Sequence, residues 1–275
     1  MVNRLLIMSL FLILTACTQS IQRETGTLNL SYKLYSDENT SPLGLRITII
    51  RPEIAKELSP EDKLKPRRSY LSSLITPLIE EEVNLNYFND KFHNNYERIV
   101  RMAFGNALHE LFTSQGFEAI GPYDTMDDMV YRDKKESYLV LVPKLDLIIS
   151  RVRNDRVCEI WSKICREEGT IQIGGEFRFD FLEPLTQEKI LTKRINLYNL
   201  YIQKDYIKEY RKRSGIISNM FAYGRTLTDT TDKALTDALN DFYARSMKKI
   251  ARFMEKEEML SYQEDISNLK KEKTY

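Results

Sequence analysis

The stretch YLVLV, Tyr138–Val142, decides the fold, and it continues through PKLDLIIS to Ser150. No residue of YLVLV is charged, so both faces of a strand built from it need to be covered. Strands with this pattern occupy the centre of a sheet that is buried on both sides. We therefore expect a central strand that starts at Tyr138 and extends to Ser150, with the other elements arranged around it.

The residues before this strand alternate with a period of two and then change to a helical period. The predicted elements are strands at 28–34 and 45–49, a helix over 96–112 and a short strand at 117–120. Pro52 ends the second strand, and Gly116 is placed to end the helix. An acidic loop then leads to the central strand.

The residues after the central strand predict a hairpin and a second long helix. The expected elements are strands at 170–181 and 190–202, joined by the turn EPLTQE, and a helix within 228–254. Gly174–Glu176 interrupts the first of these strands and predicts a β-bulge. Asp229, Thr230 and Thr231 are the cap candidates of the helix. Beyond Met254 the chain is charged, which predicts a solvated helix that frays.

This order of elements predicts the α/β (α+β) class. We expect a single domain over 27–275, with a mixed, mostly antiparallel sheet and two main amphipathic helices packed on one face. Residues 52–89 contain Pro52, Pro60, Pro66 and Pro77 without a sustained period, which predicts a long irregular excursion with one short helix near SSLITPLIEEE.

The N-terminus reads as a lipoprotein signal peptide over 1–16. Its apolar run, Leu5–Leu14, is shorter than the roughly 20 residues that a membrane-spanning helix needs. LTAC, Leu14–Cys17, has the form of a lipobox, in which the cysteine is acylated and becomes the first residue. We expect lipidation at Cys17, a lipidated tether over 17–26, and membrane attachment through the acyl chains. Thr18 favours the outer membrane, and secretion with a free Cys17 is the alternative.

Composition limits the partners and the chemistry. Residues 1–16 contain Arg4 as their only charge, so the remaining chain has 40 basic and 40 acidic residues. This balance argues against nucleic acid as a partner. The histidines, His93 and His109, have no neighbours at metal-binding spacing, and no nucleophile motif is present. We expect no metal, no cofactor and no catalytic residues; a carboxylate pair assembled by the fold stays open as an alternative to a non-enzyme.

Cys158 and Cys165 are candidates for a disulfide, since an exported protein meets oxidising conditions. On a helix their Cα atoms would lie about 10 Å apart, whereas a disulfide needs less than about 7 Å. Pairing therefore requires a loop or hairpin tip. Their place between two predicted antiparallel strands favours pairing over free thiols on a helix.

Two basic and aromatic clusters are candidates for binding an acidic sugar. They are RVRNDRVCEIWSKICR at 151–166 and YIKEYRKR at 206–213. A guanidinium group can hold a carboxylate with paired hydrogen bonds, and aromatic faces cover the apolar side of a sugar ring. The glycan-binding candidates are Arg153, Arg156, Trp161, Lys163, Arg211 and Arg213. The competing interpretation is a solvated charged loop with the tryptophan tucked beneath it.

The mature chain resembles the neuraminyllactose-binding haemagglutinin family, the flagellar-sheath adhesin lipoproteins of Helicobacter. The matching stretches, in order, are LNLSY, IIRP, QGFEAI, KKESYLV, FLEP, NLYIQKDY, DALNDFYARSM and LSYQEDISNLKKEK. The lysine-rich stretch of the namesake has no counterpart, and the cysteine loop takes its place, so the chain resembles a paralogue.

The resemblance implies an outer-membrane or flagellar-sheath lipoprotein that binds sialylated host glycans at the cell surface. The alternative is a structural or accessory envelope lipoprotein that binds envelope or flagellar proteins and no sugar. The side of the membrane that it faces decides between them.

Overall fold

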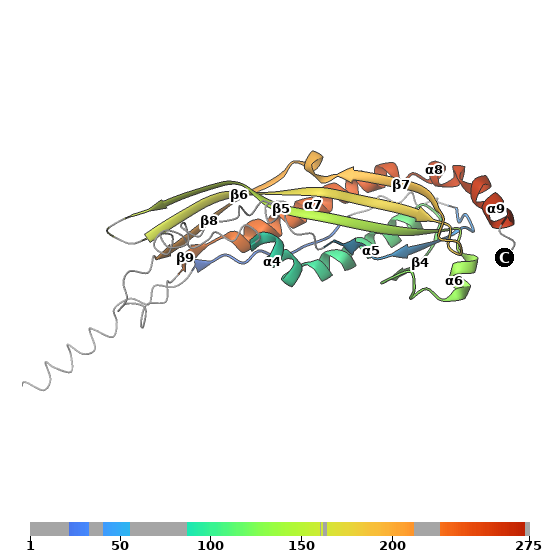
Figure 1. Ribbon diagram of the computed structural model, residues 1–275, viewed down its shortest axis with the longest axis horizontal. Coiled ribbons are helices and arrows are strands. Elements are labelled where there is room, and N and C mark those ends of the chain that lie inside the picture. Colours follow the sequence, from blue (N-terminus) through green and yellow to red (C-terminus); the bar gives the residue numbers. More distant parts are fainter. Residues whose placement is uncertain are drawn as a thin grey trace, which may run out of the picture.

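Strands β5 (Leu139–Cys158) and β6 (Ile164–Leu182) form one long antiparallel hairpin around which the molecule is built (Figure 1). The computed structural model describes residues 22–32, 41–55, 87–159, 161, 164–211 and 226–272. The predicted central strand is confirmed, and it runs past Ser150 as far as Cys158.

The hairpin is part of a mixed sheet with the order β1-β9-β8-β6-β5-β2-β4, in which β3 also pairs with β5 and β7 with β6. The remaining strands are β1 (Gln22–Arg23), β2 (Arg46–Ile50), β3 (Glu53–Ile54), β4 (Glu118–Tyr123), β7 (Lys189–Asn196), β8 (Ile202–Arg211) and β9 (Thr226–Asp229). Pairing is parallel between β2 and both β4 and β5, and antiparallel throughout β5–β6–β8–β9.

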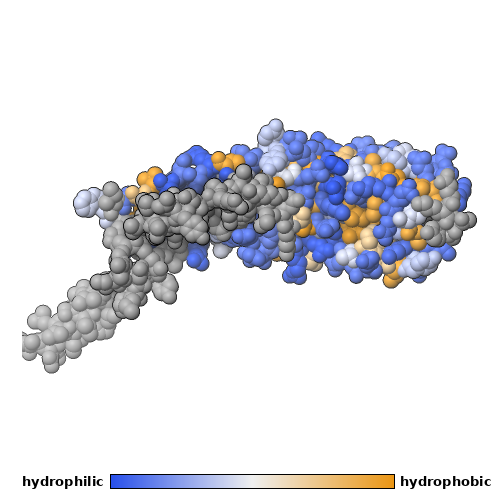
Figure 2. Space-filling view, viewed as in Figure 1, coloured by the Kyte–Doolittle hydropathy of each residue, from blue (hydrophilic) through white to orange (hydrophobic). Residues whose placement is uncertain are grey.

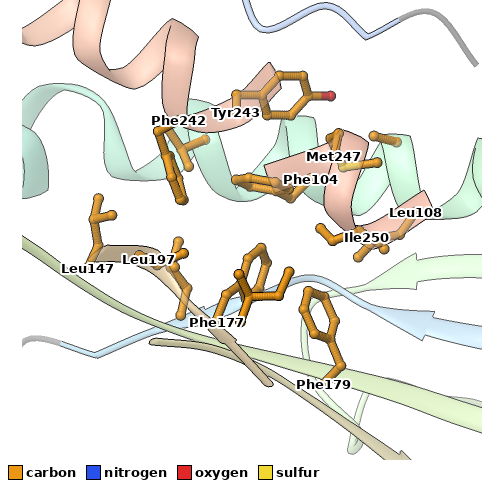
Figure 3. Packing of buried hydrophobic residues seen from close by; sticks show 14 of the residues in the cluster. Phe104, Leu108, Leu147, Phe177, Phe179, Leu197, Phe242, Tyr243, Met247 and Ile250 are labelled. Carbon is orange, nitrogen blue, oxygen red and sulfur yellow. The ribbon is translucent and has the colours of Figure 1, made fainter. Parts of the chain in front are cut away.

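The helices are α4 (Tyr87–Asn95), α5 (Glu97–Ser114), α6 (Tyr131–Glu136), α7 (Thr231–Phe253), α8 (Lys256–Ser261) and α9 (Gln263–Glu272). The two long helices, α5 and α7, pack on the same face of the sheet, as the sequence predicted (Figure 3). The ring of Phe104 in α5 lies 5.0 Å from that of Phe177 in β6 and 5.5 Å from that of Phe242 in α7. This contact joins both helices and the sheet into one core.

The opposite face of the sheet is covered where β5 begins. Val140 packs there with Ile50 and Met129, and Met129 belongs to the acidic loop before α6. Leu139 and Leu141 face the main core. YLVLV is thus buried on both faces, which is what its uninterrupted apolar run predicted.

The far half of the hairpin, together with the strands paired to it, forms what we call the arm. It consists of residues 151–158 of β5, residues 164–173 of β6, and strands β8, β9 and β1. Figure 1 shows the arm at one end of the molecule, with α6, α9 and the C-terminus at the other. On the face shown in Figure 2, the coloured surface is mostly hydrophilic, with apolar residues in scattered groups.

Strand β6 changes partner at Gly174 and Gly175. It pairs with β8 over Ile164–Ile173 and with β7 over Glu176–Leu182. The register with β5 is unbroken at the glycines, and the irregularity lies between Arg151 and Arg153 instead. The predicted bulge at Gly174–Glu176 is therefore wrong. A Cβ on Gly174 would lie 2.1 Å from the ring of Tyr198, so this glycine makes room for an aromatic ring.

The predicted strand at 190–202 is also wrong beyond Asn196. The side chain of Asn196 accepts a hydrogen bond from the backbone N–H of Tyr198, and a 3₁₀ turn, η2 (Leu197–Leu200), follows. This turn connects β7 to β8. Both strands pair with the same edge of β6, and β8 lies nearer the end of the arm.

The predicted strand at 28–34 is not formed over the described residues, which end at 32 on this side. Asn240 of α7 bonds the backbone here instead: its Oδ1 accepts from the N–H of Asn29, and its Nδ2 donates to the carbonyl of Thr27. Leu28 and Leu30 are half-buried against the core. Apolar and polar residues alternate here because one side of the segment packs against the core beside α7 and the other side faces solvent.

The C-terminal tail packs more firmly than its charge suggests. Met254, Met259 and Ile266 are buried in the main core. The hydroxyl of Tyr138 donates a hydrogen bond to the carbonyl of Met259. The expected frayed helix is thus two short helices, α8 and α9, held by these apolar residues.

The N-cap of α7 is Thr230, one of the predicted residues, and it makes no side-chain cap hydrogen bond. Asp229 accepts hydrogen bonds from the backbone N–H and the hydroxyl of Thr231, whereas the Thr230 hydroxyl accepts from the N–H of Ile207 in β8. Within the excursion at 52–89, the structure describes β3 and the start of α4. The expected short helix near SSLITPLIEEE lies outside the described residues.

Candidate functional site

The end of the arm carries the disulfide that the sequence suggested. Cys158 and Cys165 face each other in the last pair of the β5–β6 ladder, with Cα atoms 4.0 Å apart, and their sulfurs are bonded at 2.08 Å. The cysteines thus occupy a hairpin tip and close the loop at 159–163.

Strand β8 brings the two predicted basic and aromatic clusters together. Cys165 pairs with Tyr210, and Ile164 pairs with Arg211. The guanidinium carbon of Arg156, from the first cluster, lies 5.3 Å from the ring centroid of Tyr210, from the second. Segments some fifty positions apart in the sequence therefore form one surface.

Trp161 stands in the turn beyond the disulfide, and 97% of it is exposed. The interpretation in which this tryptophan is tucked beneath a charged loop is therefore wrong. Val157, immediately before the disulfide, is also exposed, at 69%. We call the surface formed by Arg156, Val157, Trp161, Tyr210 and Arg211 the arm tip.

Part of the charge on the arm is neutralised within the arm. Arg153 donates a hydrogen bond to Asp155 at 2.8 Å, and this bond raises the pKa of the guanidinium. Arg166 binds Glu168 at 2.6 Å and lies 3.7 Å from Glu209. Of the predicted candidates, Arg153 is thus already paired with an acid.

Arg156 and Arg211 differ from these paired arginines. Within the described part of the chain, neither has a carboxylate at ion-pair distance. They are the described candidate cations that remain open to an external anion. Lys163, Arg213 and the lipidation candidate Cys17 lie outside the described residues.

A buried polar cluster lies at the root of the arm and was not predicted from the sequence. Tyr206 donates a hydrogen bond to Glu167, and Arg151 lies 3.5 Å from the same carboxylate. The guanidinium carbon of Arg151 is 5.4 Å from the ring centroid of Phe88 in α4. Burial raises the pKa of the Tyr206 hydroxyl; Arg151 opposes this shift and Glu167 adds to it.

This cluster fixes the arm to the helix layer. The signal that could have found it is the spacing of four between Ile202, Tyr206 and Tyr210, which places all three on one face of a strand. Because this stretch was interpreted as a basic and aromatic cluster, it was not predicted to be a strand with one buried face.

Within the described ranges, no group of three or more histidine, cysteine, aspartate or glutamate side chains is arranged to hold a metal ion. His93 is 2.8 Å from Glu97, one helical turn on in sequence. The expectation that the protein is not an enzyme stays a prediction. No helix among the described residues is long and apolar enough to cross a membrane.

Comparison with known proteins assigns the class. A family model described as "Neuraminyllactose-binding hemagglutinin precursor" matches residues 59–273, which is most of the chain. The chain therefore belongs to the neuraminyllactose-binding haemagglutinin family, as its sequence suggested.

Individual relatives come from Helicobacter pylori. Proteins named "Neuraminyllactose-binding hemagglutinin" from strains ATCC 700392 / 26695 and J99 are each 24% identical to this chain over 195 residues, covering 66% of it and 73% of the relative. A crystal structure of a neuraminyllactose-binding hemagglutinin homologue from the same species superposes with a TM-score of 0.51 at 13% identity, covering 86% of this chain and 99% of that one. These values confirm the fold and are those of a paralogue.

Proposed function

We propose that this protein is an outer-membrane or flagellar-sheath lipoprotein, attached through Cys17, that binds sialylated glycans at the arm tip. The observation that carries the proposal is the contact of Arg156 with Tyr210 beside the exposed Trp161. It combines a guanidinium group without an acidic partner among the described residues with two aromatic side chains, on a tip closed by a disulfide.

The chemistry of a sialylated glycan matches these groups. Its carboxylate is a partner for the planar donors of Arg156 or Arg211. The apolar faces of its sugar rings can lie against Trp161 or Tyr210. The names of the Helicobacter pylori relatives give independent support, since they specify neuraminyllactose as the ligand of those proteins.

Trp161 is the only tryptophan of the chain, so its fluorescence reports on the arm tip alone. Titration with sialyllactose should change this emission, and lactose, which lacks the carboxylate, should not. Arg211→Ala should weaken sialyllactose binding by about 10-fold or more, since a hydrogen bond to a charged group contributes roughly 1.5–3 kcal/mol.

Arg194→Ala is the matched control, because Arg194 is an exposed arginine on β7, outside the arm. It should leave the affinity unchanged. A wild-type protein that responds equally to sialyllactose and lactose, or to neither, would rule out this ligand class.

A second candidate is an accessory envelope protein that binds other proteins and no sugar. The internal pairing of Arg153 and Arg166 favours it, because it removes these two guanidinium groups from carboxylate recognition. A photo-crosslinking residue at position 161 should then capture a defined envelope or flagellar protein in cells. The same residue at position 131, an exposed site at the far end, should not.

A further inference from the structure

The N-terminal strand of the described chain is part of the arm. Gln22 in β1 pairs with Thr228 in β9, Thr228 pairs with Glu209 in β8, Glu209 with Arg166 in β6, and Arg166 with Val157 in β5. These residues form one row across the sheet. Gln22 is therefore level with Val157, which directly precedes the disulfide.

The direction of β1 determines where the preceding residues leave the domain. Strand β8 runs toward the tip, since its last residue, Arg211, pairs with Ile164. Strand β9 is antiparallel to β8 and β1 is parallel to β9, so both run away from the tip. The chain before Gln22 therefore enters the sheet from the tip side.

The distance from the anchor is limited by chain length. Cys17 precedes Gln22 by five positions, and five residues span at most about 18 Å whatever path they take. Adjacent strands are about 4.8 Å apart, so the hairpin tip lies roughly 20 Å to the side of β1. Trp161 stands in the turn beyond the Val157 row, on the side of that row from which the chain enters β1.

We propose that the arm tip rests on the headgroup layer of the membrane in which Cys17 is anchored. Trp161 and Val157 enter the interface, and Arg156 and Arg211 face anionic headgroups. The inference rests on the lipid anchor of the proposed function and not on its glycan. It gives the arm tip the protein's own lipid surface as its partner in place of the glycan, because the same side chains cannot face both at once.

The side chains of the arm tip suit such a surface. Tryptophan is enriched where membranes meet water, because one side of its ring is apolar and its N–H is polar. Arginine binds phosphate with paired hydrogen bonds, and basic residues near an anionic surface are attracted to it. The nearby acids Asp155 and Glu168 are bound to arginines, which reduces their repulsion of the headgroups.

The test uses the mature lipidated protein in vesicles of phosphatidylcholine and phosphatidylglycerol, with flotation to select the vesicle-bound fraction. Trp161 emission in that fraction should be quenched by phosphatidylcholine brominated on its acyl chains. Acrylamide added to the water should quench it several-fold less than it quenches the same protein without vesicles.

A matched control moves the single tryptophan to the other end of the molecule. In the double variant Trp161→Phe and Tyr131→Trp, the probe sits at the start of α6, where Tyr131 is 69% exposed and opposite the arm (Figure 1). Its emission should be insensitive to brominated lipid and fully open to acrylamide. Val157→Asp, which leaves Trp161 as the probe, should reduce lipid quenching, whereas Val130→Asp near α6 should not.

The outcomes separate the proposals. If the protein floats and Trp161 remains open to acrylamide without lipid quenching, the membrane contact is refuted and the anchor stands. If sialyllactose alone then protects Trp161, the arm tip is a glycan site that faces away from the membrane. If the wild-type protein does not float, the anchor is refuted, and this inference with it.

Discussion

The ring of Tyr206 in β8 covers Gly169 in β6, its direct partner in the ladder, so closely that a Cβ on Gly169 would lie 2.4 Å from the Cζ of Tyr206. The absence of a side chain at Gly169 thus lets the tyrosine lie flat on the arm and reach Glu167 with its hydroxyl.

Gly169→Ala should therefore destabilise the protein by roughly 1–3 kcal/mol, as is usual when a methyl group is forced into a packed site. Urea unfolding measures this change. In the double variant with Tyr206→Ala, the clash is absent, so the two effects should be clearly less than additive. Additive effects would mean that the ring moves aside without cost.

Removing the disulfide should loosen the arm tip. In the chain-entropy model a bridge that closes so short a loop contributes roughly 2–3 kcal/mol. The double variant Cys158→Ser and Cys165→Ser should lower the urea midpoint accordingly, and reductant should lower that of the wild type but not that of the variant. Alkylation followed by intact mass checks the premise: labelling of both cysteines without reductant would contradict the bridge.

The folded protein should lose stability in acid partly through Asp232, at the start of α7. Burial would raise the pKa of this carboxyl, but hydrogen bonds from Lys91 and Tyr96 outweigh it, so the pKa is lowered. The stabilisation is then fully present above the unfolded pKa of about 3.9 and is lost as the pH falls through the lower, folded value.

Asp232→Asn should accordingly cost roughly 1–3 kcal/mol at neutral pH, and its deficit relative to wild type should shrink below about pH 4. Thermal unfolding across pH measures both trends. Asp127→Asn, in the exposed acidic loop, is the matched control and should stay within about 0.5 kcal/mol at every pH. A deficit for Asp232→Asn that is constant with pH would show that the carboxylate charge has no part in it.

Substitution of Phe104 should cost more stability than most core substitutions, because its ring contacts Phe177 in the sheet and two rings of α7. These are Phe242 and Tyr243. Phe104→Ala is expected to cost about 3–5 kcal/mol. Met102→Ala on the same helix removes a side chain that is 43% exposed and should change stability by less than about 0.5 kcal/mol. Similar losses for both would contradict the assigned core.

Local patterns predicted the body of the fold well where burial sets the period. The run at YLVLV and the apolar stripe of α5 each indicate that a face of the element is buried. The structure contains both elements. The period of two at Leu28 and Leu30 failed because it reports alternate burial and not strand pairing. There, a side chain of α7 supplies the hydrogen bonds that a neighbouring strand would have given.

The candidate site was predictable in composition but not in arrangement. Both basic and aromatic clusters were visible in the sequence, and the position of the cysteines between two predicted strands favoured a hairpin tip. Their meeting could not be inferred, since the contact of Arg156 with Tyr210 depends on β6 exchanging β7 for β8. That exchange depends on the turn at Leu197–Leu200 and on glycines that leave space for a ring.

The exchange of partners at Gly174 and Gly175 also separates the arm from the part of the sheet that β7 covers, so the length of the arm can change beyond the cluster that fixes it to the helices. Side chains along a strand repeat every second residue, so inserting two residues into β5 and two opposite them in β6 keeps every face as it is. Placed on the tip side of the cluster of Arg151, Glu167 and Tyr206, each such insertion would lengthen the hairpin by about 7 Å and leave the contact of the arm with the helix layer unchanged. The length of the arm can therefore change by two residues per strand at a time while the sequence of the core stays the same.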